Sequence, residues 1–180
     1  MNIKGIPSSR QTEELAKEFG VPLTSFAEVK QLDITIDGAD EIDPSFNLIK
    51  GGGGALLREK MIAMAANTLI IAADDSKLVR QLGRFPLPVE VVPFGWEATA
   101  HQLRKHGCIP ILRKKNEKTF VTDNGNYILD CQFSEILQPR ELHQQLKVIV
   151  GVVETGLFPE MANVIVISGE ENGVTITEKK

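Results

Sequence analysis

Two neighbouring stretches, Asp37-Gly38-Ala39-Asp40-Glu41-Ile42-Asp43 and Lys50-Gly51-Gly52-Gly53-Gly54, decide how this 180-residue chain is expected to fold. Residues 33–36 lead into the first stretch and have the pattern of a strand. An apolar helical pattern follows the second stretch, from about 54 to 67, and a second strand pattern covers 68–73. A strand, a crossover helix and another strand in this order are typical of a parallel sheet.

The four consecutive glycines indicate a binding loop. Glycine at a helix entrance costs conformational entropy, so a chain keeps it where the backbone needs unusual freedom. One such need is close approach of a ligand, because the N–H groups at the positive end of a helix dipole bind anions and oxygen-rich groups. The alternative is a flexible linker, but the run lies between strongly patterned segments and contains no serine.

Polar side chains follow both predicted strands. Asp37 and Asp40 come after the first strand, and Asp74 and Lys77 come after the second. Because ligands of open parallel sheets bind beyond the carboxyl ends of the strands, we expect both clusters at one edge of the sheet. Each residue also has an ordinary structural explanation, since Asp-Gly is a common turn and most lysines are solvated.

Glu59 lies in the first part of the predicted helix, whose surface is apolar on almost every side. Such a helix is buried, so we expect burial to raise the carboxyl pKa of Glu59 while the helix N-terminus lowers it. A carboxylate of this kind suits a general base. The alternative is an ion pair with Arg58, Lys60 or a neighbouring segment. One apolar stripe at helical spacing consists of Leu57, Met61, Met64 and Ala65.

The order of elements changes after about residue 85. Two prolines in the segment 83–88 indicate a hinge, and an Asn124-Gly125 turn between apolar runs predicts a hairpin. We expect a Rossmann-like catalytic domain over residues 1–85 and an α+β insert over residues 86–154. Residues 155–180 are expected to return to the first sheet. Outside the central motif the patterns predict a strand at 2–6, helices at 12–19, 96–106 and 139–148, and strands at 150–153 and 163–167.

Composition narrows the classes of function. A net charge of −4 and a pI near 5.5 argue against nucleic acid or an acidic membrane as the main partner. Cys108 and Cys131 fit no zinc spacing and are expected as reduced core residues. The three histidines share no spacing, so we infer no metal. Without a membrane-spanning run or a signal-peptide pattern, the expected location is the cytoplasm.

These motifs resemble a known family, type A ribose-5-phosphate isomerase. The resemblance rests on Asp37-Gly38-Ala39-Asp40-Glu41 followed by Lys50-Gly51-Gly52-Gly53-Gly54-Ala55-Leu56-Leu57-Arg58-Glu59-Lys60, and it extends over almost the whole chain. Further matching segments are 85–91, 121–126 and 151–158. The resemblance implies interconversion of ribose 5-phosphate and ribulose 5-phosphate through an enediolate, without a metal or an organic cofactor.

The same resemblance implies roles for individual residues. Glu59 is implied as the general base, and Asp37, Asp40 and Lys50 as groups that assist ring opening and proton transfer between oxygens. The family also implies a dimer or a tetramer. The implied substrate-binding residues are Asp37, Gly38, Ala39, Asp40, Lys50, Gly51, Gly52, Gly53 and Lys77.

The chain departs from the family pattern at its N-terminal side. Family members usually begin with a helix and a strand that lead into a Gly-Thr-Gly-Ser-Thr phosphate loop, and residues 1–9 instead resemble the family's second strand and the loop after it. We therefore expect the usual first βα unit to be absent, through a misassigned start, a shortened chain or a degenerate copy. The alternatives to an isomerase are a non-catalytic sugar-phosphate-binding module and an inactive truncated copy, although an intact Glu59 argues against a pure sensor.

Overall fold

The computed structural model of the protein describes residues 3–169 and 173–179 and contains a mostly parallel sheet, as predicted. Its strand order is β1-β4-β12-β13. The first three of these strands are parallel, and the last is antiparallel to its neighbour. The four strands are β1 (Leu32–Asp37), β4 (Ala66–Asp74), β12 (Val164–Gly169) and β13 (Gly173–Glu178). The predicted return of the chain to the first sheet is therefore confirmed by β12.

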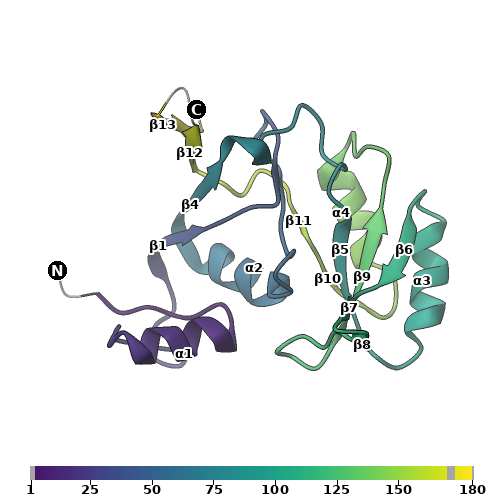
Figure 1. The fold of residues 1–180 in the computed structure, drawn as a ribbon, viewed down its shortest axis with the longest axis horizontal. Coiled ribbons are helices and arrows are strands. Elements are labelled where there is room, and N and C mark those ends of the chain that lie inside the picture. The colour runs from purple at the N-terminus through teal and green to yellow at the C-terminus, as the bar shows by residue number, and fades with distance from the viewer. Residues whose placement is uncertain (1–2, 170–172, 180) are drawn as a thin grey trace.

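A second sheet, with the order β10-β5-β9-β6, is antiparallel throughout. Its strands are β5 (Leu87–Val91), β6 (Ile109–Leu112), β9 (Tyr127–Gln132) and β10 (Val152–Thr155). The helices α3 (Trp96–Arg104) and α4 (Pro139–Lys147) accompany this sheet, which lies beside the first one (Figure 1). The α/β class with a second α+β part is thus confirmed, whereas the predicted domain limits stay a prediction.

Helix α2 (Leu56–Ala65) lies between the two sheets (Figure 1). It packs against β1 and β4 of the first sheet and against β5 and β10 of the second. The helix ends earlier than predicted because Ala66 is already extended, with φ −92° and ψ 143°, and pairs with Leu32.

The prediction that α2 is buried on almost every side is wrong for one face. Leu56, Ile62 and Ala63 are buried, but Met61 is 54% exposed and Met64 is 76% exposed. The helix has two apolar faces, and hydrophobicity alone does not predict which of them is buried. Contacts with the two sheets select the face that contains Leu56 and Ala63, which is the one nearest Glu59.

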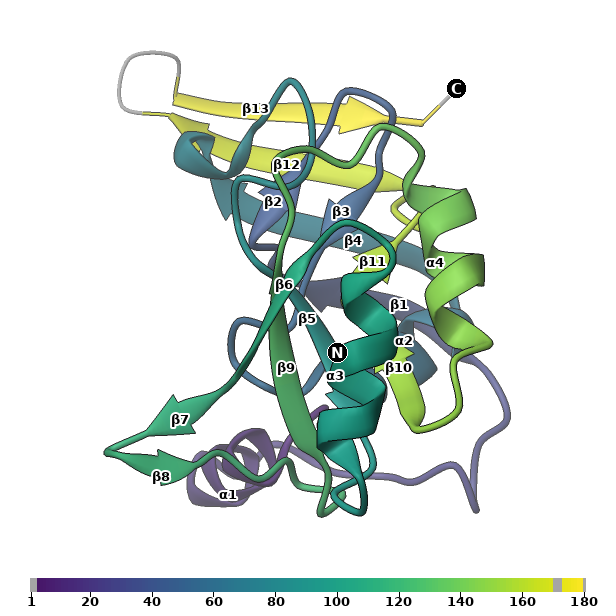
Figure 2. The same cartoon turned by 90° about the vertical axis from the view of Figure 1, so that its right-hand side faces the viewer.

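Short strands connect the two sheets. β2 (Glu41–Ile42), β3 (Leu48–Ile49) and β11 (Leu157–Phe158) form a sheet of order β11-β3-β2. This sheet joins the segment after β1 to the segment that leaves the second sheet. The remaining small elements are the hairpin β7 (Lys114–Lys115) and β8 (Lys118–Thr119), which projects from the second sheet (Figure 2), and the 3₁₀ turn η1 (Asp75–Lys77).

The N-terminal elements agree only in part with the predictions. Residue 2 lies outside the described residues, and from residue 3 onward the predicted strand is reduced to an isolated bridge between Gly5 and Leu23. Helix α1 (Arg10–Glu18) begins two residues earlier than predicted, because the hydroxyl of Ser9 caps it by accepting a hydrogen bond from the Thr12 N–H. Gly20 follows it with φ +67°, the left-handed conformation typical of a helix end.

The predicted hairpin around Gly125 forms its turn but not its first strand. Gly125 has φ +80° and donates its N–H to the Thr122 carbonyl at 2.9 Å. The segment before the turn is held by one backbone bond across the turn, from the Thr122 N–H to the Asn126 carbonyl at 2.9 Å, and by the Thr122 hydroxyl, which donates to the buried Glu90 carboxylate at 2.9 Å. The strand prediction for residues 121–122 was therefore wrong.

Two hydrophobic cores support this arrangement. One lies in the second sheet and contains the free cysteines Cys108 and Cys131, both buried as predicted. The other lies around the first sheet and the short strands, and includes Ile71 and Phe158. In the part of the chain that the structure describes, we find no helix with the length and apolar character needed to cross a membrane.

Candidate active site

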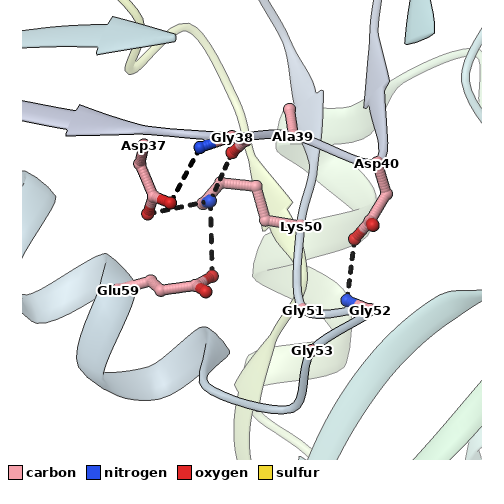
Figure 3. A pocket seen from close by; sticks show the side chains of 9 residues that line it. All are labelled: Asp37, Gly38, Ala39, Asp40, Lys50, Gly51, Gly52, Gly53 and Glu59. Atoms are coloured by element: carbon pink, nitrogen blue, oxygen red, sulfur yellow. Dashed lines mark hydrogen bonds and ion pairs between the residues drawn. The ribbon is translucent and has the colours of Figure 1, made fainter. Parts of the chain in front are cut away.

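A cleft of about 220 Å³ opens where β1 ends, beside the glycine loop (residues 51–54) and the first turn of α2 (Figure 3). The parallel arrangement of β1 and β4 places the carboxyl ends of both strands at this edge. The lining residues are Asp37, Gly38, Ala39, Asp40, Lys50, Gly51, Gly52, Gly53 and Glu59. The structure thus brings together all the residues predicted for the site except Lys77, while their individual roles stay predictions.

Lys50 joins the two sides of this cleft. Its ammonium lies 2.9 Å from the Asp37 carboxylate and 3.3 Å from the Glu59 carboxylate, and it donates a hydrogen bond to the Gly38 carbonyl at 2.5 Å (Figure 3). The lysine is only 4% exposed. Its backbone N–H donates to the Gly156 carbonyl at 2.9 Å, so the position of Lys50 is fixed from behind the cleft as well.

Glu59 lies in the first turn of α2 and is largely buried, with 14% of its side chain exposed. Burial raises its carboxyl pKa, the Lys50 ammonium opposes this shift, and the Asp37 carboxylate adds to it. Its Oε2 atom is buried and accepts no hydrogen bond with acceptable geometry from the residues that the structure describes. Of the two opposing effects expected from sequence, burial therefore has the larger influence on the pKa of Glu59.

Of the alternative ion pairs considered for Glu59, those with Arg58 and Lys60 are not formed, whereas the pair with a neighbouring segment is formed, with Lys50 at 3.3 Å. Arg58 instead lies 3.5 Å from Asp123 and binds Asn124. Lys60 points to the second sheet, where it meets Glu154 at 2.8 Å. Glu59 is therefore left to interact with Lys50, a residue on the far side of the glycine loop.

The glycine loop is shaped by contacts that exclude larger residues. The Gly52 N–H donates to the Asp40 carboxylate at 2.7 Å, and a Cβ at Gly52 would lie 2.5 Å from that carboxylate. Gly54 has φ +89°, and a Cβ there would meet the Phe120 ring at 2.4 Å. Gly53 differs, because a Cβ there would meet nothing within 4 Å. The fold does not require glycine at position 53, so the free space there is available to a ligand.

Lys77 lies in η1, directly after β4, at the same edge of the sheet as the cleft. It is not among the lining residues. Asp74 begins this turn by accepting a hydrogen bond from the Ser76 N–H at 3.0 Å. The contact between Lys77 and a substrate therefore stays a prediction.

Sequence reasoning missed a buried charged cluster beneath α2, which we call the Lys60 joint: Lys60, Lys147 and Glu154. The Lys60 ammonium donates to the Glu154 carboxylate at 2.8 Å and to the Thr155 carbonyl at 2.6 Å, and the Lys147 ammonium lies 3.1 Å from Glu154. Burial lowers the pKa of Lys60 to about 8, although Glu154 opposes the shift. Lys60 is separated from Glu154 by more than 90 residues of sequence, so no local pattern pointed to this pair.

Two further residues that support the site were also missed. The buried Glu41 carboxylate accepts the N–H groups of Gly83 and Phe85, at 2.8 and 2.6 Å, and so holds the predicted hinge. Arg113 donates to the carbonyls of Gly51 and Gly52. Glu41 belongs to the acidic stretch 37–43, so its position beside Asp40 could have identified it as a residue near the site. Arg113 gave no such signal, because its contact spans more than 60 residues.

The arrangement is suited to proton transfer at a small polar molecule. A buried carboxylate with a raised pKa, an ammonium and backbone N–H groups share one small cleft. Within residues 3–169 and 173–179, no group of three or more His, Cys, Asp or Glu side chains is arranged to hold a metal ion.

Comparison with known proteins identifies relatives along nearly the whole chain. Residues 4–173 match the family model described as ribose 5-phosphate isomerase A (phosphoriboisomerase A). Ribose-5-phosphate isomerase A 1 of Oceanobacillus iheyensis is 55% identical over 172 residues, which are 96% of this chain and 77% of that protein. Ribose-5-phosphate isomerase A of Bacillus mycoides is 51% identical over 175 residues, 97% of this chain and 79% of that protein.

Solved structures agree with these relatives. A D-ribose-5-phosphate isomerase in complex with phospho-erythronic acid has a TM-score of 0.95 and 39% identity, covering 99% of this chain and 79% of that chain. Ribose 5-phosphate isomerase from Plasmodium falciparum has a TM-score of 0.94 and 44% identity, covering 97% and 77%. With this agreement in sequence and fold over nearly its whole length, the chain belongs to the ribose 5-phosphate isomerase A family.

Proposed function

We propose that this chain is an aldose–ketose isomerase that interconverts D-ribose 5-phosphate and D-ribulose 5-phosphate through an enediolate. The observation that carries the proposal is the Glu59 carboxylate, which is buried, has a raised pKa and lies 3.3 Å from the Lys50 ammonium in the cleft. Family membership supports the choice of substrate.

In the proposed reaction, Glu59 takes the proton from C2 of the open-chain aldose, and the electron pair of the broken C–H bond moves toward the C1 carbonyl oxygen. Lys50 stabilises the negative charge that develops on the enediolate oxygens. Glu59 then returns the proton to C1, while the hydroxyl proton of O2 passes to O1. The product is the ketose, and no proton is gained or lost overall.

Asp37 and Asp40 are proposed to assist ring opening and the transfer between oxygens. Asp37 shares the Lys50 ammonium with Glu59, so it lies close to the reacting atoms. Asp40 is anchored to the glycine loop through the Gly52 N–H. The remaining proposed substrate contacts come from Gly38, Ala39, Gly51, Gly52, Gly53 and Lys77.

A raised pKa suits the base role of Glu59. A base is most effective when its pKa lies near the working pH, because it then accepts a proton readily and still remains largely ionised. Burial supplies the upward shift, and Lys50 limits it. The Lys50 charge therefore favours the ionised form of Glu59, while burial makes the carboxylate more basic.

We also propose that the chain acts in the cytoplasm as a homodimer or homotetramer, with its domains divided at residues 1–85, 86–154 and 155–180. The family resemblance supports the oligomer, and the two buried free cysteines support a reducing compartment. Light scattering coupled to size-exclusion chromatography tests the assembly, and a single species with the mass of one chain contradicts it.

The test of the function is Glu59→Gln. This change keeps the size of the side chain and removes its ability to accept a proton, so kcat is expected to fall by about 10²- to 10⁴-fold. Glu97→Gln is the matched control, because Glu97 lies in the first turn of α3, is exposed and does not line the cleft. An unchanged kcat for Glu59→Gln in a coupled ribulose 5-phosphate assay overturns the assignment of the base.

A further inference from the structure

Arg113 lies outside the cleft and binds the backbone of the glycine loop that forms one of its walls. It follows β6 in the second sheet and is mostly buried, with 13% of its side chain exposed. Its Nη1 donates to the Gly51 carbonyl at 2.8 Å and to the Gly52 carbonyl at 3.0 Å. Arg113 itself does not line the cleft. It therefore holds the glycine loop from a position that leaves the cleft free.

The guanidinium is fixed in turn by its own surroundings. It forms a two-pronged ion pair with Asp130 of β9, in which Nε donates to Oδ2 at 2.9 Å and Nη2 binds Oδ1. The Phe120 ring lies 5.9 Å from the guanidinium and also contacts Gly54. These contacts leave Nη1 aimed at the loop carbonyls.

Asp40 and Arg113 hold opposite ends of one peptide group. The peptide between Gly51 and Gly52 gives its carbonyl to Arg113 and its N–H to the Asp40 carboxylate, at 2.7 Å. In a trans peptide the C=O and N–H bonds point in opposite directions, and no cis peptide occurs in the described residues. The orientation of this peptide is therefore fixed from both sides.

The next peptide group is held from one side only. The Gly52 carbonyl also binds Arg113, so planarity turns the Gly53 N–H away from Arg113. Within the described ranges, this N–H donates no hydrogen bond, and Gly53 lines the cleft with open space around its Cα. A donor that is held in place and has no partner is suited to an incoming oxygen atom.

We propose that Arg113 is a positioning residue that aims the Gly53 N–H at an oxygen of the sugar phosphate bound in the cleft. This inference rests on the proposed function for the identity of the ligand. Arg113 does not touch the substrate in this account, and its effect passes through the Gly52 carbonyl.

Two variants separate positioning from a purely structural role. Arg113→Met removes the donors to the loop, whereas Asp130→Asn removes the charge of the ion pair but keeps the guanidinium and one acceptor oxygen to orient it. Because a hydrogen bond to a charged group is at stake, we expect KM for ribose 5-phosphate to rise at least about tenfold in Arg113→Met. We expect a much smaller rise in Asp130→Asn, even if both variants lose similar thermal stability. Equal KM changes that follow the loss of stability overturn the inference.

The amide resonance of Gly53 provides a readout that does not depend on turnover. In the ¹⁵N-labelled wild-type chain, phospho-erythronic acid, the ligand bound to one of the solved relatives, is expected to shift this resonance. Arg113→Met should abolish the shift, and Asp130→Asn should retain it. If Arg113→Met does not fold, Arg113→Lys serves instead, because one ammonium preserves the charge but does not reproduce the guanidinium fork.

The failure of this inference differs from the failure of the proposed function. A wild-type chain that isomerises ribose 5-phosphate but shows no shift of Gly53 on addition of phospho-erythronic acid overturns the Arg113 inference alone. A wild-type chain without isomerase activity refutes the proposed function. In that second case a Gly53 shift that Arg113→Met abolishes still supports the inference, and no shift overturns it.

Discussion

Lys50 and Lys60 are two buried lysines that lie near the ring of Phe158 but belong to different parts of the structure. Their ammonium groups are 5.6 and 4.7 Å from the centre of the fully buried Phe158 ring, and the residues are 4% and 5% exposed. Burial therefore does not distinguish them. Lys50 borders the cleft, whereas Lys60 belongs to the joint between α2 and the second sheet.

The difference lies in the balance of charge around each lysine. Lys50 faces two carboxylates, Asp37 and Glu59, so the cleft carries more acid than base. In the Lys60 joint two ammonium groups share the single carboxylate of Glu154. Burial is the main cause of the raised pKa of Glu59 and of the lowered pKa of Lys60, and the excess of like charge in each cluster strengthens its shift. The excess of carboxylate in the cleft favours a basic Glu59, whereas the excess of ammonium beneath α2 accompanies a contact between the helix and the second sheet.

Lys50→Met is expected to have the largest effect on catalysis. Loss of a group that stabilises developing negative charge lowers kcat by about 10²- to 10³-fold. Because the Lys50 charge lowers the pKa of Glu59, its removal should also move the acid limb of the kcat/KM profile to higher pH. Steady-state kinetics across pH measure both effects. An unmoved acid limb would mean that Lys50 does not govern the ionisation of Glu59.

Lys60→Met is expected to act on stability instead. Removal of one partner from a buried ion pair costs about 3 kcal/mol of unfolding free energy, and the remaining Lys147 contact with Glu154 should limit the loss. Urea denaturation measures this value, and kcat should change far less than in Lys50→Met. A loss of kcat as large as that of Lys50→Met would erase the contrast between the two lysines.

The two central glycines of the loop are expected to show a similar contrast, in which Gly52 affects stability and Gly53 affects substrate binding. Gly52→Ala places a Cβ against the Asp40 carboxylate and should cost about 1–3 kcal/mol of stability. Gly53→Ala meets no atom within 4 Å, so its unfolding free energy should stay within about 0.5 kcal/mol of the wild type. It should raise KM, however, because the methyl group would occupy the space that we propose for the sugar. Thermal melts and KM measured on both variants test this division, and an unchanged KM for Gly53→Ala argues against that use of the space.

The smallest effect expected is the pH dependence of stability caused by Glu59. Its folded pKa is raised, so the folded state binds its proton more tightly than the unfolded state does. This contribution is therefore present at low pH and is lost as pH rises through the ordinary glutamate range to the raised value. Glu59→Gln should be more stable than the wild type near neutral pH, and its advantage should shrink on acidification. An advantage that is constant with pH contradicts the assigned sign.

The parts of the site that follow strand ends were predictable from sequence. Asp37 and Asp40 follow β1, and the glycine loop leads into α2, so a local succession of elements placed them at one edge. The burial of Glu59 was predicted for a partly wrong reason, because Met64 on another face of the same helix is exposed. Periodicity identifies the apolar faces of a helix, but tertiary contacts select which one is covered.

The parts that depend on distant partners were not predictable. Arg113 and the Lys60 joint are pairings between the two halves of the molecule, and a basic residue carries no local mark of whether it will be buried. The first strand of the predicted hairpin failed for a related reason. Thr122 is held by Glu90, whose burial depends on the second sheet as a whole.

Gly156 limits how this protein can be recombined. Its carbonyl holds the Lys50 N–H at 2.9 Å, its own N–H binds the Pro88 carbonyl at 2.7 Å, and a Cβ would lie 2.3 Å from the Lys50 carbonyl. The chain thus enters the second sheet near Pro88 and leaves it near Gly156, and these two residues meet directly behind Lys50. Gene shuffling therefore cannot delete or exchange the second sheet on its own, because Lys50, Pro88 and Gly156 must come from the same parent sequence.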